Sequence, residues 1–298
     1  MSVIKMQQLS KRYGHRVGID AVDLDVAEGE TFGFLGPNGA GKTTTIRLLL
    51  GFLRPSQGHA SVFGLDCWRK SPQIKRDVGY LPGDLRLYSW LTVRKTLEIV
   101  GRVRGLDLRK EGAILAERFQ LEMDLRVRKM SRGMRQKLGI IMALAHKPRL
   151  LVLDEPSSGL DPLMQAELSD CLREFTSDGH TVFLSSHTLS EVESLCDRVA
   201  IVRRGQIIAD QPLQSLRDRA LRIVEILFPD QETADRVKLP TFMTLDRRDG
   251  RRFECELEGP TQPLIEWAAR QEIEDISIGK PDLERLFHKY YQSPSELQ

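Results

Sequence analysis

Apolar and polar residues alternate along the first part of the chain and then give way to apolar runs. Residues 3–9 and 17–26 alternate between apolar and polar positions, which predicts strands of a half-exposed antiparallel sheet. The segment ETFGFLG, residues 30–36, is apolar enough to predict a buried strand that runs into a glycine loop. A helix is predicted directly afterwards in KTTTIRLLLG, residues 42–51, and its apolar face ends at Gly51.

The middle of the chain follows the helical period. Residues 92–145 carry apolar positions at helical spacing, with breaks predicted at Gly105 and around 129–133. Strands are then predicted in RLLVLDEP, HTVFLSS and RVAIVRRG, and they alternate with helices over 162–176 and 188–196. Such alternation is typical of a parallel sheet covered by helices on both faces.

A boundary is predicted after Pro212, where a charged segment begins. From about residue 221, strand-like pieces (LRIVEILF, RRFECELEG) alternate with helix-like pieces (QPLIEWAARQ, PDLERLFHKYY). We therefore predict two domains, over residues 3–215 and 221–298, and expect the second to be a small α+β unit. A chain of 298 residues is long enough for this division.

Composition narrows the function classes. The chain has 44 Lys and Arg against 42 Asp and Glu, and a net charge of +2 argues against a dedicated DNA-binding protein. Its four cysteines form no C-x-x-C pair and are expected to be reduced, mostly buried thiols. No signal-peptide core is visible, and no apolar run approaches the roughly 18 residues that span a bilayer. A membrane role therefore requires a partner.

The segment GPNGAGKTT, residues 36–44, satisfies the pattern G-x-x-x-x-G-K-[ST]. Its glycines let backbone N–H groups wrap around phosphates, and the following helix adds its dipole. Lys42 supplies charge to the transferred phosphate, and the Thr43 hydroxyl can ligate Mg²⁺. A flexible turn matches this pattern only rarely, and here the motif lies between a predicted strand and a predicted helix. A nucleotide is therefore expected to contact Gly36, Pro37, Asn38, Gly39, Ala40, Gly41, Lys42, Thr43 and Thr44.

Two adjacent carboxylates end the predicted strand LLVLDEP. Asp154 is placed to help hold Mg²⁺, and Glu155 to polarise a water near the γ-phosphate. D-E-P alone is more often a solvated turn, but beside a complete phosphate loop it becomes the predicted catalytic pair. His187, at the end of the next strand, either caps the following helix or contacts the γ-phosphate and orients the water. His146, two residues before a proline, is expected at the surface.

With these motifs in order, residues 3 to about 215 resemble the ATP-binding subunit of an ABC transporter, of the drug- and lipid-exporter type. The segment MSRGMRQKLG, residues 130–139, falls where that family carries its signature motif, usually L-S-G-G-Q. Ser131 and Gly133 match this motif, whereas Met130, Arg132 and Met134 replace leucine, the first glycine and glutamine.

The signature match implies that Ser131 and Gly133 grip the γ-phosphate of ATP bound to the other subunit. A helix start offers unpaired N–H groups to an anion. Serine is also a common helix N-cap, and one residue can have both roles. Tyr13, in KRYG, resembles the aromatic residue that stacks on adenine; the alternative is a half-buried tyrosine on a strand. The segment SGLDP resembles the loop that crosses the dimer interface, with residues Ser158, Gly159, Leu160 and Asp161.

The resemblance implies an α/β fold: a P-loop NTPase cassette with an antiparallel β subdomain and an α-helical subdomain at about 85–145. One departure affects the metal site. The family's glutamine, expected after VGYLP, is absent, and Gly83 stands there with Asp84 next. Either Asp84 or a water replaces it, or Mg²⁺ has one protein ligand fewer.

Two further segments resemble the family. Residues 85–97 bring Leu87, Tyr88, Trp90 and Leu91 close together, where the family has a cleft for a cytoplasmic helix of the permease. Packing inside the helical subdomain explains the same residues equally well. The segment PDLERLFHKYY resembles the tail ending of exporter ATPases.

The function implied is an ATPase subunit, with ATP and Mg²⁺ as cofactors, that dimerises around two ATPs and drives a separate integral-membrane permease in export. The second ATP-binding subunit is expected to be another copy, and the location cytoplasmic, on the inner face of the cell membrane. The alternative is a soluble ABC-type ATPase acting on the ribosome or nucleic acid. Such proteins generally carry two cassettes or a long coiled coil, and this chain shows one cassette without sustained heptads. A third hypothesis is an ATPase whose C-terminal domain binds a ligand and thereby controls transport.

Overall fold

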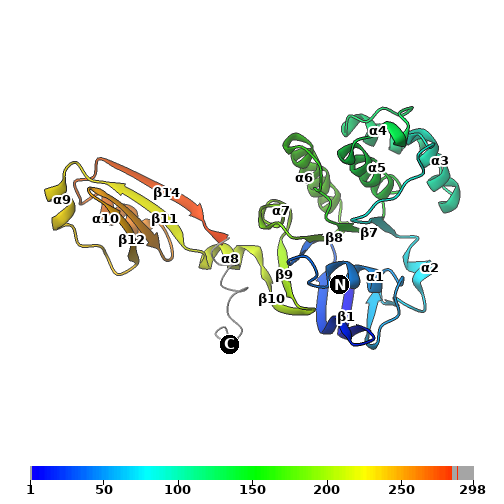
Figure 1. Cartoon of the computed structure of the whole chain (residues 1–298), viewed down its shortest axis with the longest axis horizontal. Coiled ribbons are helices and arrows are strands. Elements are labelled where there is room, and N and C mark those ends of the chain that lie inside the picture. The colour runs from blue at the N-terminus through cyan, green and yellow to red at the C-terminus, as the bar shows by residue number, and fades with distance from the viewer. Residues whose placement is uncertain (1, 284–286, 288–298) are drawn as a thin grey trace. The chain divides into compact units, whose positions relative to one another are not determined.

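The chain folds into two compact units, residues 1–210 and 211–298 (Figure 1). The structure is a computed structural model that describes residues 2–283 and 287. The division falls before the boundary of 215–221 that the sequence suggests. Among the described residues, no helix is both long and apolar enough to cross a membrane.

An antiparallel sheet begins the first unit. Strands β1 (Ser2–Tyr13), β2 (Arg16–Ala27), β4 (Gln57–Val62) and β5 (Leu65–Asp66) lie in the order β2-β1-β4-β5. Buried positions recur at intervals of two along much of β1 and β2, as the sequence predicts. Tyr13 faces Arg16 at the turn between these two strands. Tyr13 therefore lies at one end of the sheet, at the turn that joins β1 to β2.

The central sheet has six strands in the order β10-β9-β3-β8-β7-β6. They are β3 (Thr31–Leu35), β6 (Val78–Leu81), β7 (Leu150–Asp154), β8 (Thr181–Ser186), β9 (Arg198–Arg203) and β10 (Gln206–Pro212). Strand β3 pairs in parallel with β8 and β9, and β7 with β6 and β8. Strands β3, β7 and β8 are buried along their whole length, which explains their apolar sequences. Their carboxyl ends therefore meet at one edge of the sheet.

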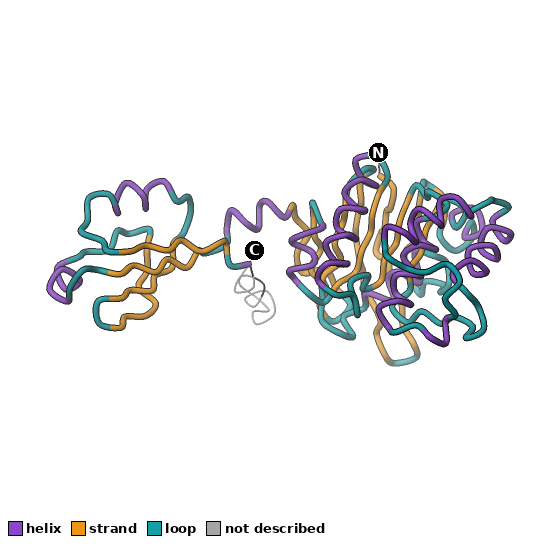
Figure 2. Tube along the Cα trace, turned by 90° about the horizontal axis from the view of Figure 1, so that it is seen from above, coloured by secondary structure: helices purple, strands orange, loops and turns teal. Residues whose placement is uncertain are grey.

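Helices α1 (Lys42–Leu49), α6 (Pro162–Ser177) and α7 (Leu189–Leu195) follow strands of the central sheet, and α2 (Ser71–Ile74) precedes β6. Figure 2 shows the strands of this unit between helices. Inside, the ring of Phe32 on β3 stacks on that of Phe183 on β8, with centroids 5.8 Å apart. This apolar packing fixes β3 and β8, whose ends carry the phosphate loop and His187.

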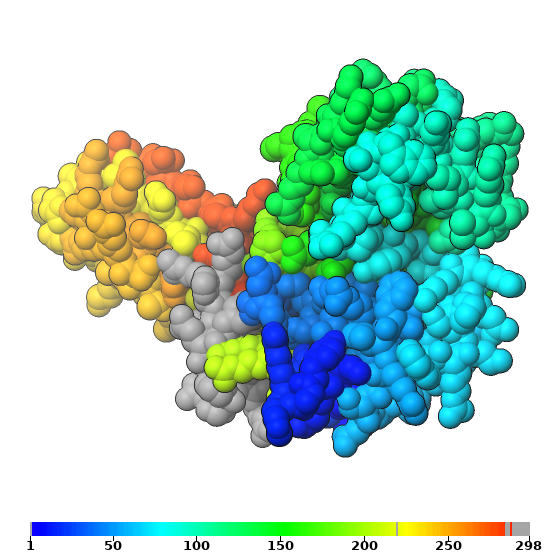
Figure 3. All heavy atoms as spheres, turned by 45° about the vertical axis from the view of Figure 1, so that its right-hand side comes forward, coloured from blue at the N-terminus to red at the C-terminus, as the bar shows by residue number. Residues whose placement is uncertain are grey.

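Helices α3 (Val93–Arg104), α4 (Arg109–Arg118) and α5 (Arg132–Leu144), with the 3₁₀ turn η1 (Val127–Lys129), form a lobe of the first unit (Figure 3). The predicted break at Gly105 is confirmed, since this residue ends α3 with φ 70°. The second break is longer than predicted and runs from the end of α4 to the start of α5. Gln120, with φ 52°, takes a left-handed conformation just after α4 and turns the chain out of the helix.

The second unit contains α8 (Leu213–Arg219), β11 (Arg222–Leu227), α9 (Gln231–Arg236), β12 (Met243–Asp249), β13 (Arg252–Leu257), α10 (Gln262–Ala268) and β14 (Asp275–Pro281). After α8 the order is βαββαβ, and the antiparallel sheet has the order β12-β13-β11-β14. This is a ferredoxin-like arrangement. Its core joins Ala234 and Leu264 of the helices to Val224, Phe253 and Cys255 of the sheet. The segment PDLERLFHKYY lies outside the described residues except at 281–283 and 287.

Candidate functional site

The loop between β3 and α1 is built around two glycines that no other residue can replace without a clash. A Cβ at Gly36 would lie 2.4 Å from the Val202 carbonyl oxygen, and Gly41 has φ 111°. Helix α1 begins at Lys42, has no side-chain N-cap bond and carries no acidic residue in its first turn. Its first N–H groups and its dipole therefore favour an anion at the loop.

Lys42 is buried, with its side chain 6 % exposed, and lies beneath this loop. Its Nζ donates hydrogen bonds to the carbonyl oxygens of Gly36 (2.6 Å) and Pro37 (3.3 Å), and lies 3.7 Å from Glu155 Oε1. Burial lowers the pKa of the Lys42 ammonium, and the carboxylates of Glu155 and Asp154 oppose that shift. Lys42 thus places a charge at the loop and connects it with the end of β7.

Asp154 ends β7 and is 3 % exposed. Its Oδ2 accepts a hydrogen bond of 2.9 Å from Thr43 Oγ1, and its Oδ1 accepts one of 2.5 Å from Ser185 Oγ. A buried carboxylate is thereby held beside the hydroxyl of the phosphate loop. Ser185 was not identified from the sequence, since only the parallel pairing of Asp154 with Ser185 brings the two side chains together.

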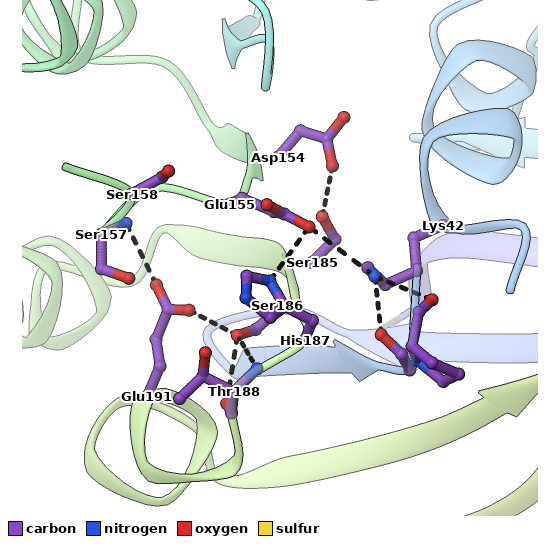
Figure 4. A network of polar contacts seen from close by, with 12 residues as sticks. Lys42, Asp154, Glu155, Ser157, Ser158, Ser185, Ser186, His187, Thr188 and Glu191 are labelled. Atoms are coloured by element: carbon purple, nitrogen blue, oxygen red, sulfur yellow. Dashed lines mark hydrogen bonds and ion pairs between the residues drawn. The ribbon is translucent and has the colours of Figure 1, made fainter. Parts of the chain in front are cut away.

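Glu155 has a φ of 54°, a left-handed conformation that costs a non-glycine residue about 1–3 kcal/mol. Hydrogen bonds hold it there: its N–H donates to the Ser185 carbonyl at 3.0 Å, and its carbonyl accepts from Gln136 Nε2 at 3.1 Å. Its Oε1 lies 3.2 Å from His187 Nδ1. Figure 4 shows Glu155, His187 and Lys42 pointing toward one another from three different segments.

His187 is not the cap of the next helix. The N-cap position of α7 is Thr188, and it makes no side-chain cap bond. The His187 side chain is 50 % exposed and is held at the end of β8 beside Glu155. The capping alternative raised by the sequence therefore finds no support in these contacts.

Glu191, in the first turn of α7, connects the two loops that carry Glu155 and His187 (Figure 4). Its Oε1 accepts a hydrogen bond of 3.2 Å from the Ser157 N–H, and its Oε2 accepts one of 2.5 Å from Ser186 Oγ. Ser186 Oγ also accepts a bond from the Thr188 N–H. Sequence reasoning missed Glu191 because nothing local distinguishes it from a solvated helix residue.

A cleft of about 410 Å³ lies over the phosphate loop. Tyr13, the last residue of β1 and 44 % exposed, is a half-buried tyrosine on a strand and also contributes to the wall of this cleft. The residues lining the cleft are Tyr13, Arg16, Val17, Gly18, Asn38, Gly39, Gly41, Lys42, Thr43, Thr44, Arg47 and Glu155. Gly36, Pro37 and Ala40, which were also expected to contact the nucleotide, belong to the same loop but are not part of this lining.

None of the described residues lining the cleft comes from segment 130–139, although Gln136 of this segment donates to the Glu155 carbonyl. Ser131 is the N-cap of α5, and its Oγ accepts a 3.2 Å hydrogen bond from the Met134 N–H. A Cβ at Gly133 would lie 2.4 Å from the Gly159 carbonyl oxygen, so this segment touches the loop of residues 158–161 in the same chain. That loop ends at Asp161, whose side chain accepts from the Met164 N–H and caps α6, with Leu160 buried.

Gly83 lies against the buried carboxylate of Asp154. A Cβ at this position would be 3.4 Å from Asp154 Oδ2, an ordinary contact. The Asp84 carboxylate instead pairs with Arg86 at 2.9 Å, and the side chain is 78 % exposed. Asp84 and a water are the two candidates to replace the missing glutamine as a ligand of Mg²⁺. In this structure the Asp84 carboxylate is paired with Arg86 instead.

Tyr88 and Trp90 are exposed at 72 % and 60 %, and their rings lie 6.1 Å apart. Leu91 beside them is buried. Packing inside the helical lobe therefore explains the apolar side chain of Leu91 but not those of Tyr88 and Trp90, whose rings are exposed at the surface.

The expectation that His146 lies at the surface was wrong. Its ring is half-buried, Nε2 contacts the Val78 carbonyl oxygen at 3.2 Å, and Nδ1 is buried without a hydrogen-bond partner among the described residues. Burial lowers its pKa to about 4. The nearby proline gave no indication of this environment, because the contact comes from β6, far away in sequence.

Comparisons with known proteins show the family of this chain. A family model described as ABC transporter matches residues 19–158. The bacitracin transport ATP-binding protein of Bacillus licheniformis is 37 % identical over 236 residues, covering 78 % of this chain and 77 % of the relative. A daunorubicin resistance ATP-binding protein of Streptomyces coeruleorubidus is 36 % identical, covering 96 % and 95 %. The Nod factor export ATP-binding protein I of Rhizobium etli is 31 % identical, covering 96 % and 92 %.

Solved structures show the same architecture. One, an ATP-binding subunit of an ABC transporter, is 30 % identical with a TM-score of 0.68, covering 72 % of this chain and 92 % of its own. A second, an ATP-binding cassette solved as a dimer with ADP and Pi, has a TM-score of 0.64 at 22 % identity and covers 70 % and 98 %. The second likeness concerns the fold alone.

Proposed function

Since this chain belongs to the family of ABC transporter ATP-binding proteins and is an ATPase subunit, we propose that it dimerises around two ATPs and drives a separate membrane permease in export. The observation that carries the catalytic part is the approach of Glu155 Oε1 to His187 Nδ1 (3.2 Å) and Lys42 Nζ (3.7 Å) beside the phosphate loop. These three side chains are the base, the water- or phosphate-positioning group and the charge that hydrolysis requires.

ATP binds in the cleft over the phosphate loop. Adenine stacks on Tyr13 at one end, and the phosphates lie on the N–H groups of residues 36–44 at the other. Lys42, now bonded to loop carbonyls, donates to the β- and γ-phosphates. The cleft is large enough to hold part of a nucleotide. Its walls combine an aromatic ring, which can stack on adenine, with cations, which can bind phosphates.

Thr43 and Asp154 fit Mg²⁺, because two hard oxygen donors lie 2.9 Å apart at the phosphate loop. The ion, when bound, neutralises charge on the β- and γ-phosphates. Ser185 holds the other oxygen of Asp154 and so fixes the direction of the carboxylate. Asp84 is bonded to Arg86, so we propose that water fills the place of the missing glutamine oxygen.

Hydrolysis requires a water in line with the bond between the γ-phosphorus and the bridging oxygen of ADP. Glu155 accepts a proton from this water as its oxygen attacks the γ-phosphorus, and the bond to the bridging oxygen breaks, releasing ADP and phosphate. His187 orients the water or the γ-phosphate. The clamps on Glu155 from Gln136 and Ser185 keep its strained backbone in one conformation, which spares the reaction the cost of ordering it.

Each ATP site is completed by the second subunit. Ser131 and Gly133 do not line the cleft of their own chain, although their helix start suits an anion. A structural neighbour is a dimer with ADP and Pi. We therefore assign Ser131 and Gly133 to the γ-phosphate held by the partner, with residues 158–161 crossing between subunits.

The permease is a separate membrane protein. The names of the relatives refer to bacitracin transport, Nod factor export and daunorubicin resistance, which favours export. The exposed rings of Tyr88 and Trp90 suit a docking surface for the permease's cytoplasmic segment. The subunit then lies on the inner face of the cell membrane.

The catalytic assignment is tested with purified protein. Glu155→Gln should lower the kcat of ATP hydrolysis by about 10²–10⁴ while ATP affinity changes little, since the carboxamide cannot accept the proton. Glu117→Gln, at an exposed carboxylate of α4, is the matched control and should keep wild-type turnover. If Glu155→Gln and the wild type hydrolysed ATP at the same rate, Glu155 would be excluded as the base.

A further inference from the structure

Position 132 is where this chain departs from the family signature by carrying a cation in place of the first glycine. We propose that Arg132 delivers its guanidinium to the γ-phosphate of the ATP held by the partner subunit and is a catalytic residue of that composite site. The inference rests on the proposed two-subunit site. It adds to that site a positive charge that the usual L-S-G-G-Q sequence does not contain.

The contacts of Arg132 keep its charge available. Nη2 donates a 2.6 Å hydrogen bond to Ser158 Oγ, a neutral acceptor. Its aliphatic stem passes Gly159, where a Cβ would lie 3.2 Å from Arg132 Cγ, so glycine leaves room for the arginine. Arg132 is exposed, and within the described part of the chain it forms no ion pair with a carboxylate. The positive charge is therefore not neutralised inside the subunit.

Electrostatics at the start of α5 also favour an anion. The first turn of this helix carries Arg132 and Arg135 and no acidic residue. Cations in this position oppose the helix dipole. The two charges are therefore mildly unfavourable in the subunit alone and become favourable once a phosphate is bound against Ser131 and Gly133.

Arg132 lies on the surface that the partner is proposed to cover. It joins the signature segment to Ser158, in the loop that crosses between subunits. Gly133 touches Gly159 of the same loop. A guanidinium has five donors in a planar fork, so Arg132 can keep its bond to Ser158 and direct further N–H groups at a phosphate. The hydroxyl of Ser158 thus holds the arginine near the position of the γ-phosphate.

The chemistry that Arg132 would assist is the charge redistribution of the hydrolytic step. The proton of the attacking water passes to Glu155, and the electrons of the broken bond pass to the oxygen of ADP. Arg132 transfers neither and lowers the energy of the negative charge on the phosphoryl oxygens. The competing explanation is that Arg132 only positions Ser158 by a hydrogen bond, a role that needs a donor and no charge.

Three variants of the full chain separate charge from hydrogen bonding. Arg132→Gln keeps a donor for Ser158 and loses the charge, whereas Arg132→Lys keeps the charge. An arginine supplied in trans contributes 10³–10⁵ in the best cases, so Arg132→Gln should lower kcat at least about tenfold, with Arg132→Lys clearly less affected. ATP affinity of the separated subunit should not change. Arg126→Gln, which removes an exposed charge that lies before the signature segment and outside α5, should stay within about twofold of wild type.

Either of two results overturns the proposal: wild-type kcat in Arg132→Gln, or equal losses in the Gln and Lys variants. A mixing experiment then decides on which ATP the residue acts. A Lys42→Ala chain combined with an Arg132→Gln chain leaves one composite site intact if Arg132 acts on the partner's ATP. Turnover should therefore exceed the sum of the separate activities several-fold, with mixed dimers verified by a two-tag purification. No gain would assign Arg132 to its own chain and contradict the proposal.

A parallel mixture separates this inference from the proposed function. Lys42→Ala and Gly133→Asp chains test the composite site without involving Arg132. If that pair recovers turnover while Arg132→Gln is fully active, the two-subunit site stands and the role of Arg132 falls. If that pair recovers nothing although its mixed dimers form, the composite site itself fails, and the inference fails with it.

Discussion

The carboxylate of Glu191 accepts a hydrogen bond from the Ser157 N–H at 3.2 Å, and this contact joins helix α7 to the loop that follows Glu155. The other oxygen of Glu191 bonds Ser186, the residue before His187. One side chain thereby sets the distance between two loops whose catalytic groups meet at 3.2 Å. Glu191 acts through these loops as a positioning residue.

Glu191→Ala should lower kcat by about 10- to 100-fold, because a displacement of the catalytic group by 1 Å costs as much. ATP affinity should change less than about twofold, since Glu191 does not line the cleft. Glu191→Gln keeps an acceptor for the Ser157 N–H and should lie between alanine and wild type. Steady-state kinetics with separate kcat and KM provide the test; a change confined to KM would assign Glu191 to binding instead.

Restoring the family's glutamine should strengthen Mg²⁺ binding. Gly83→Gln fits without a backbone clash, because the added Cβ would make an ordinary contact of 3.4 Å with Asp154. The carboxamide oxygen should then add a ligand and lower the Mg²⁺ concentration for half-maximal turnover several-fold. Gly83→Ala controls for the loss of glycine and should leave that concentration unchanged. An identical Mg²⁺ requirement in the glutamine variant would show that the side chain cannot reach the ion.

The environment of His146 predicts a pH effect on stability. Burial lowers its pKa from 6.5 to about 4, so the unfolded chain binds more protons than the folded one between these values. The free energy of unfolding should therefore fall as the pH drops from 6.5 to 4. His146→Gln removes this titration, and its loss of stability between pH 7 and pH 5 should be smaller by about 1 kcal/mol. Denaturant midpoints of both proteins at the two pH values measure the difference; parallel losses would count against the assignment.

Limited proteolysis tests the independence of the two units. Trypsin should cut between Pro212 and Leu221, and the amino-terminal fragment should still bind ATP. The reason is that every residue lining the cleft, with Asp154 and His187, precedes residue 190. A fluorescent ATP analogue measures binding before and after cleavage. A folded fragment without binding would show that residues beyond 212 complete the site.

The sequence predicts the parts of this site that lie in continuous motifs. Lys42, Asp154 and Glu155 each belong to a pattern whose residue types follow from phosphate or metal chemistry. The alternation of strands and helices also places these motifs at one edge of a sheet. Resemblance to a family adds Tyr13, Ser131 and Gly133, for which no local pattern is sufficient.

What the sequence does not predict depends on contacts between distant segments. Gln136 belongs to the signature segment, so its position is known from the sequence. Its hydrogen bonds to the Glu155 and Pro156 carbonyls form only because α5 packs against the loop that contains these two residues. His146 illustrates the converse, because its local sequence suggests a surface turn while β6 buries it. The strand order of the second unit likewise depends on long-range pairing that periodicity cannot determine.

The central claim is that two copies of this chain close around ATP through the signature segment. The most direct test is the mass of Glu155→Gln in solution with and without ATP and Mg²⁺, because this variant should bind ATP and hydrolyse it very slowly. Light scattering should show a monomer without nucleotide and a dimer containing two ATPs with it. The double variant Glu155→Gln, Gly133→Asp should bind ATP and stay monomeric. The account would be contradicted if Glu155→Gln, saturated with ATP, kept the mass of a monomer over the concentration range of the activity assay.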